Sequence, residues 1–118
     1  MATQSTAAGK LTAIATAMIA AYNAQDADAY VAHMTDDACE AGYRGAVVRE
    51  GKEGTREGLT KMFAEFPENR AEVVSSNELG NYVLFHERVW RSAAAEPFDV
   101  IAVYSFEGDK CARVEFIR

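Results

Sequence analysis

The sequence has few of the residues that most often hold metals or form disulfides. Its 118 residues include two histidines, His33 and His86, and two cysteines, Cys39 and Cys111. No Cys/His cluster has the spacing of metal ligands, so we expect no metal and no other cofactor. Both cysteines lie in apolar, strand-like segments, which favours two buried, reduced thiols, while a single disulfide stays open.

Positive charge is also scarce. The chain contains twelve Lys and Arg and eighteen Asp and Glu, which gives a formal net charge of -6, and it has no run of basic residues. Nucleic acids and anionic membranes are polyanions, so this balance argues against both as partners.

Long hydrophobic runs are absent, and nothing approaches the length of a membrane span. The segment from Leu11 to Ala21 has the length of a secretion signal core, but threonines interrupt it and only Lys10 precedes it as a basic residue. Its larger apolar side chains recur at helical spacing and continue to Tyr22, which is typical of an amphipathic helix that packs on a core. We therefore expect a cytoplasmic protein without an export signal.

What is present fits one globular domain of ordinary size. Hydrophobic residues make up 49% of the chain, and a chain of this length buries roughly two thirds of its unfolded surface. We expect a single domain over residues 10–118. Residues 1–9 are small and polar, and we expect them to be disordered.

The pattern predicts three helices followed by strands. The helices run from Lys10 to about Ala24, from an N-cap at Asp26 to the Thr-Asp-Asp at 35–37, and over a stripe that ends at Pro67. A short strand follows the second helix, and the glycine-rich residues 44–58 read as a loop, at most a weak candidate for a mobile lid. Four further strands, over 70–79, 82–91, 98–107 and 110–118, form an antiparallel meander with turns at Gly80-Asn81 and Gly108-Asp109. Helices followed by strands indicate an α+β fold.

Three stretches resemble the nuclear transport factor 2-like superfamily, which includes ketosteroid-isomerase-like and polyketide-cyclase-like proteins. They are AMIAAYNAQDADAYVAHMTDDACEAG (17–42), the phenylalanine-bearing helix after the glycine loop, and the final hairpin 98–118. The resemblance covers about residues 10–118. It implies a cone-shaped, cystatin-like α+β roll, with three helices packed on one face of a curved, mostly antiparallel sheet. This fold hosts isomerases, dehydratases, cyclases, hydrolases and non-catalytic binders, so it leaves the activity open.

The resemblance permits one test of mechanism. Ketosteroid isomerases use an Asp base together with an oxyanion hole made by a Tyr and a protonated Asp. In this chain the base falls at Gly42, the tyrosine at Met18, the protonated aspartate at Ala102 and a further pocket tyrosine at Met34. Every polar group of that reaction is missing, which argues against steroid isomerisation by this mechanism.

The same register predicts which side chains line the interior of the cone. Side chains alternate along a strand, so one face carries every second residue. The predicted lining is apolar and aromatic and consists of Met18, Tyr22, Tyr30, Met34, Met62, Phe63, Phe66, Tyr82, Leu84, His86, Arg88, Trp90, Val100, Ala102, Tyr104, Val114 and Phe116.

Glu40 and His86 are the candidate catalytic residues. Glu40 lies two residues before Gly42 and so shares the face on which isomerases keep their base. A carboxylate in an apolar cavity can act as acid or base near neutrality, and an unperturbed histidine titrates there as well. The alternative is that Glu40 faces water on an edge strand and that His86 is a hydrogen-bonded core histidine.

Three further residues are candidates for binding. Arg88 in the pocket would grip a carboxylate or phosphate in bidentate fashion, or else it pairs with an acid at the rim. Tyr22 and Tyr30 could donate hydroxyls into the cavity, or pack their rings and expose those hydroxyls at an end. The sequence thus indicates a protein that binds a small, largely apolar molecule. It is either a cofactor-free isomerase, dehydratase or cyclase, or a non-catalytic binder or scaffold whose own side chains fill the cone.

The face of the sheet away from the helices predicts a homodimer. Three helices cover only one side of the sheet, and a monomer rarely leaves a contiguous apolar patch of several hundred Å² in water. Acidic and basic residues interspersed in the patch suit a self-complementary two-fold contact. The predicted outer residues are Val83, Phe85, Glu87, Val89, Arg91, Ile101, Val103, Arg113, Glu115 and Ile117.

Overall fold

Helices precede most of the strands, as predicted. The protein is described by a computed structural model that covers the backbone of residues 2–118 and the side chains of residues 9–118. The elements are α1 (Ala2–Asn23), α2 (Ala27–Val31), β1 (Met34–Gly42), β2 (Val47–Glu50), α3 (Gly51–Glu65), β3 (Arg70–Leu79), β4 (Tyr82–Trp90), β5 (Phe98–Glu107) and β6 (Lys110–Ile117).

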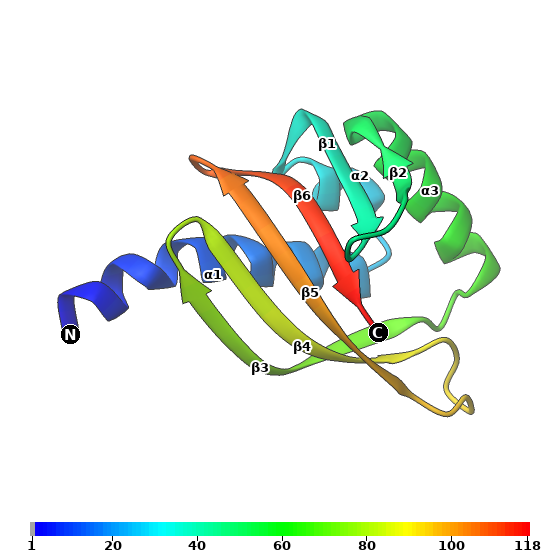
Figure 1. The fold of residues 1–118 in the computed structure, drawn as a ribbon. Coiled ribbons are helices and arrows are strands. Elements are labelled where there is room, and N and C mark those ends of the chain that lie inside the picture. Colours follow the sequence, from blue (N-terminus) through cyan, green and yellow to red (C-terminus); the bar gives the residue numbers. More distant parts are fainter. Residues whose placement is uncertain (1) are drawn as a thin grey trace.

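The strands form one curved sheet of six, in the order β2-β1-β6-β5-β4-β3. All neighbours are antiparallel except β1 and β6, which run parallel. Helix α1 crosses one face of the sheet, and α2 and α3 lie on the same side near β1 and β2 (Figure 1). The predicted α+β class, with helices on one face of a mostly antiparallel sheet, is confirmed.

Tight turns set the register of the meander. The β3–β4 and β5–β6 hairpins have two-residue loops, Gly80-Asn81 and Gly108-Asp109, at the predicted positions. Gly80 and Gly108 have φ of 60° and 61°, a conformation that glycine adopts without steric penalty. In the β4–β5 pair each even-numbered residue lies opposite an odd-numbered one, as with Val83 and Tyr104. This parity decides which residues of β4 face the helices.

Several boundaries differ from the predictions. Helix α1 begins at Ala2, not near Lys10; the side chains of residues 1–8 lie outside the described residues, and the disorder of residues 1–9 stays a prediction. Helix α2 ends at Val31, and the Thr-Asp-Asp segment belongs to β1, because Met34 pairs with Cys111 of β6. The prediction of a glycine-rich loop or lid over residues 44–58 is wrong, because most of these residues form β2 and the start of α3.

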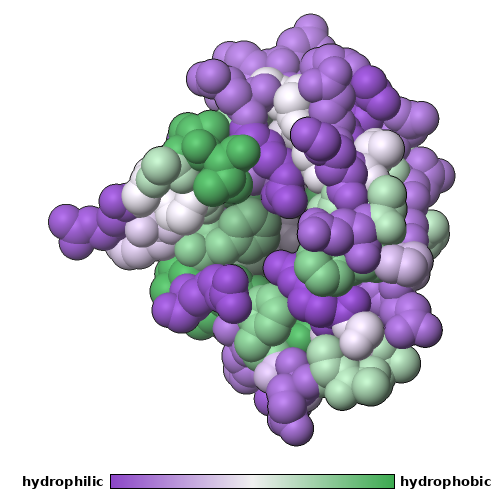
Figure 2. Space-filling model, turned by 90° about the vertical axis from the view of Figure 1, so that its right-hand side faces the viewer, coloured by the Kyte–Doolittle hydropathy of each residue, from purple (hydrophilic) through white to green (hydrophobic). Residues whose placement is uncertain are grey.

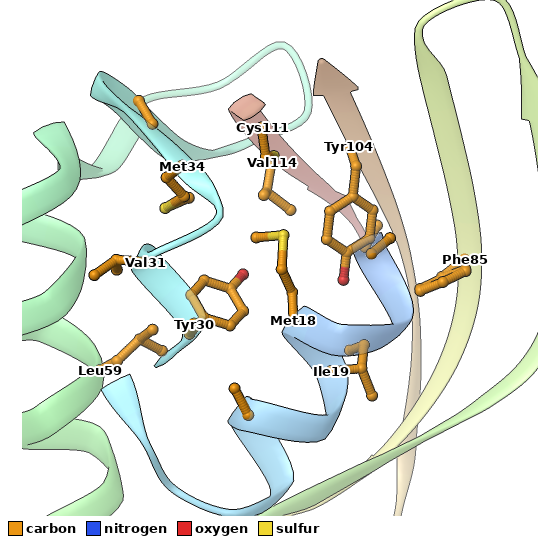
Figure 3. Close-up of a cluster of buried hydrophobic side chains, with 14 of the residues drawn as sticks. Met18, Ile19, Tyr30, Val31, Met34, Leu59, Phe85, Tyr104, Cys111 and Val114 are labelled. Carbon is orange, nitrogen blue, oxygen red and sulfur yellow. The ribbon is translucent and has the colours of Figure 1, made fainter. Parts of the chain in front are cut away.

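The core lies between the helices and the inner face of the sheet. Met18 of α1 is fully buried between Tyr30 and Tyr104 (Figure 3). Cys111 is buried there as well, whereas Cys39 is partly exposed, and both are free thiols. Of the two cysteines predicted to be buried, the structure therefore buries one. Among the described residues, no helix is long and apolar enough to cross a membrane.

Candidate functional site

A cavity of about 180 Å³ lies between the helices and the inner face of the sheet. One side of the molecule is mainly hydrophilic, with apolar side chains gathered around a hollow near its middle (Figure 2). The cavity mixes apolar, aromatic and charged groups. Its lining residues are Ile19, Tyr22, Tyr30, Glu40, Val48, Arg49, Leu59, Met62, Glu87, Val89, Arg91, Phe98, Val100, Tyr104, Phe116 and Arg118.

The predicted face of β4 is wrong. Val83 and Phe85 lie opposite Tyr104 and Ala102 of β5, and residues directly opposite in an antiparallel pair share a face. Val83 and Phe85 are accordingly buried, whereas Tyr82 is 48% exposed. The inner face of β4 therefore carries Val83, Phe85, Glu87 and Val89, and the outer face carries Tyr82, Leu84, His86, Arg88 and Trp90, all five of which were predicted to line the pocket.

Of the remaining predicted site residues, seven line the cavity, five lie in the packed core and one packs beside Arg91. The structure places Tyr22, Tyr30, Glu40, Met62, Val100, Tyr104 and Phe116 at the cavity. It places Met18, Met34, Phe63, Ala102 and Val114 in the packed core, and the ring of Phe66 beside Arg91. Three of the four positions at which ketosteroid isomerases carry polar groups, Met18, Met34 and Ala102, are thus core positions in this chain.

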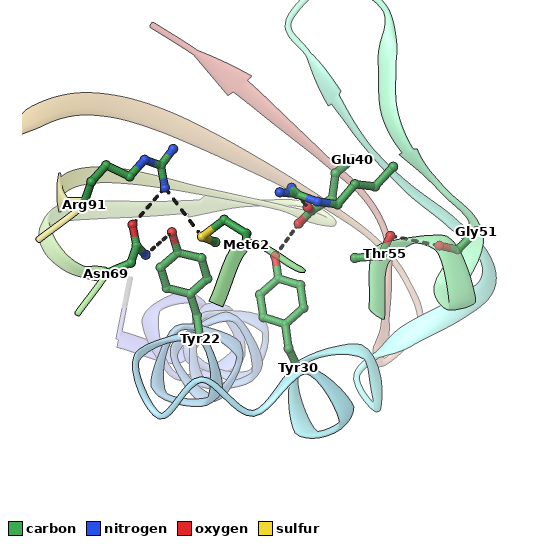
Figure 4. A network of polar contacts seen from close by, with 9 residues as sticks. Tyr22, Tyr30, Glu40, Gly51, Thr55, Met62, Asn69 and Arg91 are labelled. Atoms are coloured by element: carbon green, nitrogen blue, oxygen red, sulfur yellow. Dashed lines mark hydrogen bonds and ion pairs between the residues drawn. The ribbon is translucent and has the colours of Figure 1, made fainter. Parts of the chain in front are cut away.

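Glu40 is held at one end of the cavity by two side chains. Its carboxylate is almost completely buried, at 1% exposure. The hydroxyl of Tyr30 donates to Oε2 at 2.6 Å, and Nη1 of Arg49 donates to Oε1 at 2.7 Å. Tyr30 rises from α2 toward Glu40 (Figure 4). The buried negative charge is thereby offset by one guanidinium, which is the usual condition for burying a carboxylate.

The position of Arg49 depends on β2 and on a glycine of α3. Arg49 lies directly opposite Glu40 in the β1–β2 pair, so its side chain is on the same face. A Cβ at Gly58 would lie 2.7 Å from Nε and 2.8 Å from Cδ of Arg49. Glycine at this position therefore lets the arginine pass close to α3 and reach Glu40. Arg49 was not among the predicted site residues, because its glycine-rich segment was predicted to be a loop.

Glu87 is a second buried carboxyl in the same cavity and was also missed. It is 5% exposed, and the hydroxyl of Tyr104 donates to Oε2 at 3.1 Å. Burial raises the pKa of Glu87 from its ordinary value of 4.5 to about 7; the Tyr104 hydrogen bond lowers it, and the negative charge of Glu40 raises it further. Glu87 is thus a carboxyl that gains and loses a proton near neutral pH. The signal in the sequence is a single Glu within the apolar alternation of Val83, Phe85 and Val89.

Arg91 follows β4 at the other end of the cavity. Its Nη1 donates to Oδ1 of Asn69 at 2.8 Å and approaches Sδ of Met62 at 3.8 Å. Asn69 is itself buried and donates through Nδ2 to the hydroxyl of Tyr22 at 2.7 Å. Figure 4 shows this chain of contacts beside the Tyr30–Glu40 pair. Burial raises the pKa of Tyr22, which favours its protonated form.

The predicted Glu40–His86 pair does not form. His86 lies on the outer face of β4, where Nε2 is 2.8 Å from Oδ2 of Asp99. Arg88 also binds Asp99, with Nε 2.9 Å from Oδ1. Of the alternatives for Arg88, the structure shows pairing with an exposed acid rather than a pocket position. Among the described residues, no group of three or more His, Cys, Asp and Glu is arranged to hold a metal ion.

Comparison with known families agrees with this architecture. The model of the SnoaL-like domain matches residues 15–114, which is most of the chain. The chain belongs to the SnoaL-like family. The resemblance to nuclear transport factor 2-like proteins is confirmed by that match and by structures with the ketosteroid-isomerase-like fold. A comparison with curated proteins found no match.

Solved structures of similar proteins place the chain in the cystatin-like group of folds. An uncharacterized cystatin fold protein from Novosphingobium aromaticivorans is 63% identical, with a TM-score of 0.87 over 92% of this chain and 97% of that one. A protein with a ketosteroid-isomerase-like fold from Catenulispora acidiphila, in complex with trimethylamine, is 18% identical with a TM-score of 0.72 over 87% and 82%. An LEH-like epoxide hydrolase from M. tuberculosis is 15% identical with a TM-score of 0.77 over 93% and 83%. The last two likenesses show the fold alone.

Proposed function

We propose that this SnoaL-like protein is a cofactor-free enzyme that moves a proton on a small, mainly apolar molecule. The observation that carries the proposal is the presence of two buried carboxyls, Glu40 and Glu87, in one largely apolar cavity. A general acid or base works best when its pKa lies near the operating pH, and Glu87 meets this condition at about 7. A buried carboxyl lowers the free energy of unfolding, so two of them in one core indicate a functional role.

The two carboxyls have different environments and so take different roles. Glu40 is paired with Arg49 and accepts a hydrogen bond from Tyr30, which suits a fixed charge that orients a ligand. Glu87 has no cation beside it among the described residues and accepts one hydrogen bond from Tyr104, which suits the group that exchanges a proton. Two titratable groups whose surroundings differ in this way are typical of acid/base sites. In this proposal Glu87 replaces His86 as the partner of Glu40.

The reaction class is an isomerisation, dehydration or cyclisation, each of which needs a proton removed and returned. The structural neighbours support a small-molecule ligand, since one is an epoxide hydrolase and another holds trimethylamine. The alternative is a non-catalytic binder with the same cavity. Glu87 decides between them, because a binder does not need a carboxyl that titrates near neutrality.

A probe reaction can test the base without knowledge of the substrate. A nitro-substituted benzisoxazole loses its ring C–H proton to a carboxylate, the N–O bond breaks, and a coloured cyanophenolate is released. We expect the protein to accelerate this elimination, with a rate that rises with pH through about 7 as Glu87 ionises. Glu87→Gln should lower the rate at least tenfold, whereas His86→Gln, on the outer face, should leave it unchanged. Equal rates for the wild type and Glu87→Gln would contradict the proposal.

We also propose that the chain forms a two-fold homodimer through the outer face of the sheet. The predicted outer residues of β5 and β6 lie there, and Ile101 and Ile117 are 37% and 36% exposed. On β4 the apolar contribution comes from Tyr82 and Leu84, in place of the predicted Val83, Phe85 and Val89. Val103 lies opposite both Leu84 and Glu115, near the middle of this face.

Sedimentation tests the dimer. We expect the wild type to sediment as a dimer at micromolar concentration. Val103→Glu should yield monomer or aggregate, because it places like charges close to the two-fold axis. A monomeric wild type would contradict the dimer. The cytoplasmic location remains a prediction from the sequence.

A further inference from the structure

Arg91 is a cation in the cavity wall without a carboxylate partner. Among the described residues, every ion pair of the protein involves other side chains. The partners of Arg91 are neutral, namely the amide of Asn69, the thioether of Met62, the nearby hydroxyl of Tyr22 and the rings of Phe66 and Phe98. This differs from Arg49, whose charge is taken up by Glu40.

The neutral partners fix the guanidinium and leave part of it free. The centre of the guanidinium lies 5.6 Å from the Phe66 ring and 5.1 Å from the Phe98 ring, which are cation–π distances. Both hydrogen bonds of Arg91 to the described residues start at Nη1, so Nε and Nη2 remain as donors. No fully buried side-chain nitrogen or oxygen of the described residues lacks a partner, so these donors are not sealed in the core, and Arg91 lines the cavity. Two adjacent N–H donors of an arginine match the two oxygens of a carboxylate.

The charges around the cavity favour an anion. Arg49 and Glu40 offset each other, which leaves Arg91 as a cation of the lining without an ion-pair partner among the described residues. Glu87 is only partly ionised near neutral pH, because burial raises its pKa to about 7. The uncompensated fixed charge of the cavity is therefore positive. A cationic ligand would lie close to the positive charge of Arg91, and the cavity offers it no permanently ionised carboxylate that is free of a partner.

The spacing of Arg91 and Glu87 sets the form of the ligand. They are four residues apart in the chain, and both line the cavity together with Val89. Between them the wall is apolar, with Val89 and Val100 in one buried cluster and Phe98 and Phe116 packed against it. An anionic group at Arg91 and a reacting carbon near Glu87 thus belong to opposite ends of a ligand with an apolar middle.

We propose that the natural ligand is a small carboxylate with an apolar or aromatic body, and that Arg91, held by Asn69, binds its carboxylate. This inference rests on the proposed function only in assigning the other end of the ligand to Glu87. Arg91 thereby takes the role that was predicted for Arg88.

Benzoate and benzamide form the test pair, because they share a shape and differ in charge. We expect calorimetric titration at neutral pH to show that benzoate binds the wild type at least tenfold tighter than benzamide. Arg91→Met keeps most of the apolar stem and should abolish this preference, whereas Arg91→Lys should keep part of it. Arg88→Met, which removes an arginine from the outer face, is the matched control and should leave the preference unchanged.

Asn69→Asp provides an independent variant of nearly the same shape. It places a carboxylate where the amide oxygen lies 2.8 Å from Arg91 Nη1, so it should neutralise the guanidinium and remove the preference for benzoate. If Arg91→Met fails to fold by circular dichroism, this variant decides the question. Equal binding of benzoate and benzamide to the wild type, no benzoate binding at millimolar concentration, tighter binding of benzylamine, or a preference that survives the deciding variant would each overturn the inference.

The outcome is separable from that of the acid/base proposal. If benzoate binding depends on Arg91 while Glu87 titrates as an ordinary carboxyl, the anion site stands and the acid/base role of Glu87 falls. If Glu87 titrates near 7 and benzoate binding does not depend on Arg91, the acid/base role of Glu87 stands and the anion site falls.

Discussion

The two faces of the sheet shift the pKa of a carboxyl in opposite directions, as Glu87 on β4 and Asp99 on β5 show. On the inner face, burial raises the pKa of Glu87 to about 7. On the outer face, the hydrogen bonds from Arg88 and His86 lower the pKa of Asp99, on the neighbouring strand, to about 2. The groups lie one strand apart and differ in solvent and in partners. Access to water and the presence of a cation, rather than residue type, decide which carboxyl can exchange a proton at neutral pH.

The largest expected contrast comes from removing one arginine on each face. Arg49→Met leaves Glu40 buried without its counter-ion, and loss of one partner of a buried pair costs roughly 3–5 kcal/mol. Because the Arg49 side chain is 23% exposed, we expect the lower end, about 3 kcal/mol, in urea unfolding. Arg88→Met breaks an exposed pair and should change the free energy of unfolding little. Equal losses in the two variants would contradict the difference between the faces.

Glu87→Gln should change how stability depends on pH. The folded state holds the Glu87 proton up to about pH 7, whereas the unfolded state releases it near 4.5. Between these values the folded state binds more protons, so the free energy of unfolding falls as pH rises and the penalty is complete above pH 7. A shift of this size corresponds to at most about 3 kcal/mol. Glu87→Gln removes the carboxyl, so it should flatten this decline and be more stable than the wild type at about pH 8.5. Urea unfolding measured across this pH range tests the prediction, with His86→Gln as the outer-face control. If the free energy of unfolding depends on pH in the same way in Glu87→Gln as in the wild type, Glu87 is not the group responsible.

Tyr104→Phe should give a smaller effect of known sign. The Tyr104 hydroxyl donates to Glu87 and stabilises its charged form, which lowers the pKa of Glu87. Its removal should raise that pKa above 7 and cost about 1 kcal/mol, with a greater loss above pH 7 than below pH 5. Tyr82→Phe, on the outer face, serves as control. A cost independent of pH would show that Tyr104 contributes by packing alone.

The smallest effect should come from Asp99→Asn. The pKa of Asp99 is lowered in the folded state, so its contribution to stability is present above the unfolded value and is lost as pH falls toward 2. Because Asp99 is exposed, this contribution is small, so Asp99→Asn should flatten a shallow acid-range decline and lower stability near pH 7 only slightly. Because the group is exposed, a large loss of stability at neutral pH would mean that the outer cluster is structural.

Much of the fold could be predicted because its signals are local. The two glycine turns, the Asp26 cap, whose side chain accepts from the Ala29 amide, and the order of helices and strands all depend on neighbouring residues. The start of β1 could not be predicted this way. Met34 continues an apolar stripe on α2, and only its pairing with Cys111, far along the chain, makes it part of a strand.

The site was predictable in part for a related reason. Glu40 could be placed by its distance from Gly42, and it lies in the cavity. The alternation of Val83, Phe85 and Val89 was a weak signal for the inner face of β4, because Tyr82 and Leu84 on the other face are large side chains that can also pack in a core. The register with β5 selects the inner face, so Glu87 and His86 exchange the positions expected for them. Arg91 was assigned to the wrong face by the same error.

The central claim is that Glu87 exchanges a proton near neutral pH inside the cavity. The most direct measurement is an NMR titration of the side-chain carboxyl carbons, with the Glu87 signal assigned by its absence in Glu87→Gln. We expect a midpoint near 7 for Glu87 and near 2 for Asp99 in the same spectra. A midpoint for Glu87 at its ordinary value of 4.5 would contradict this expectation.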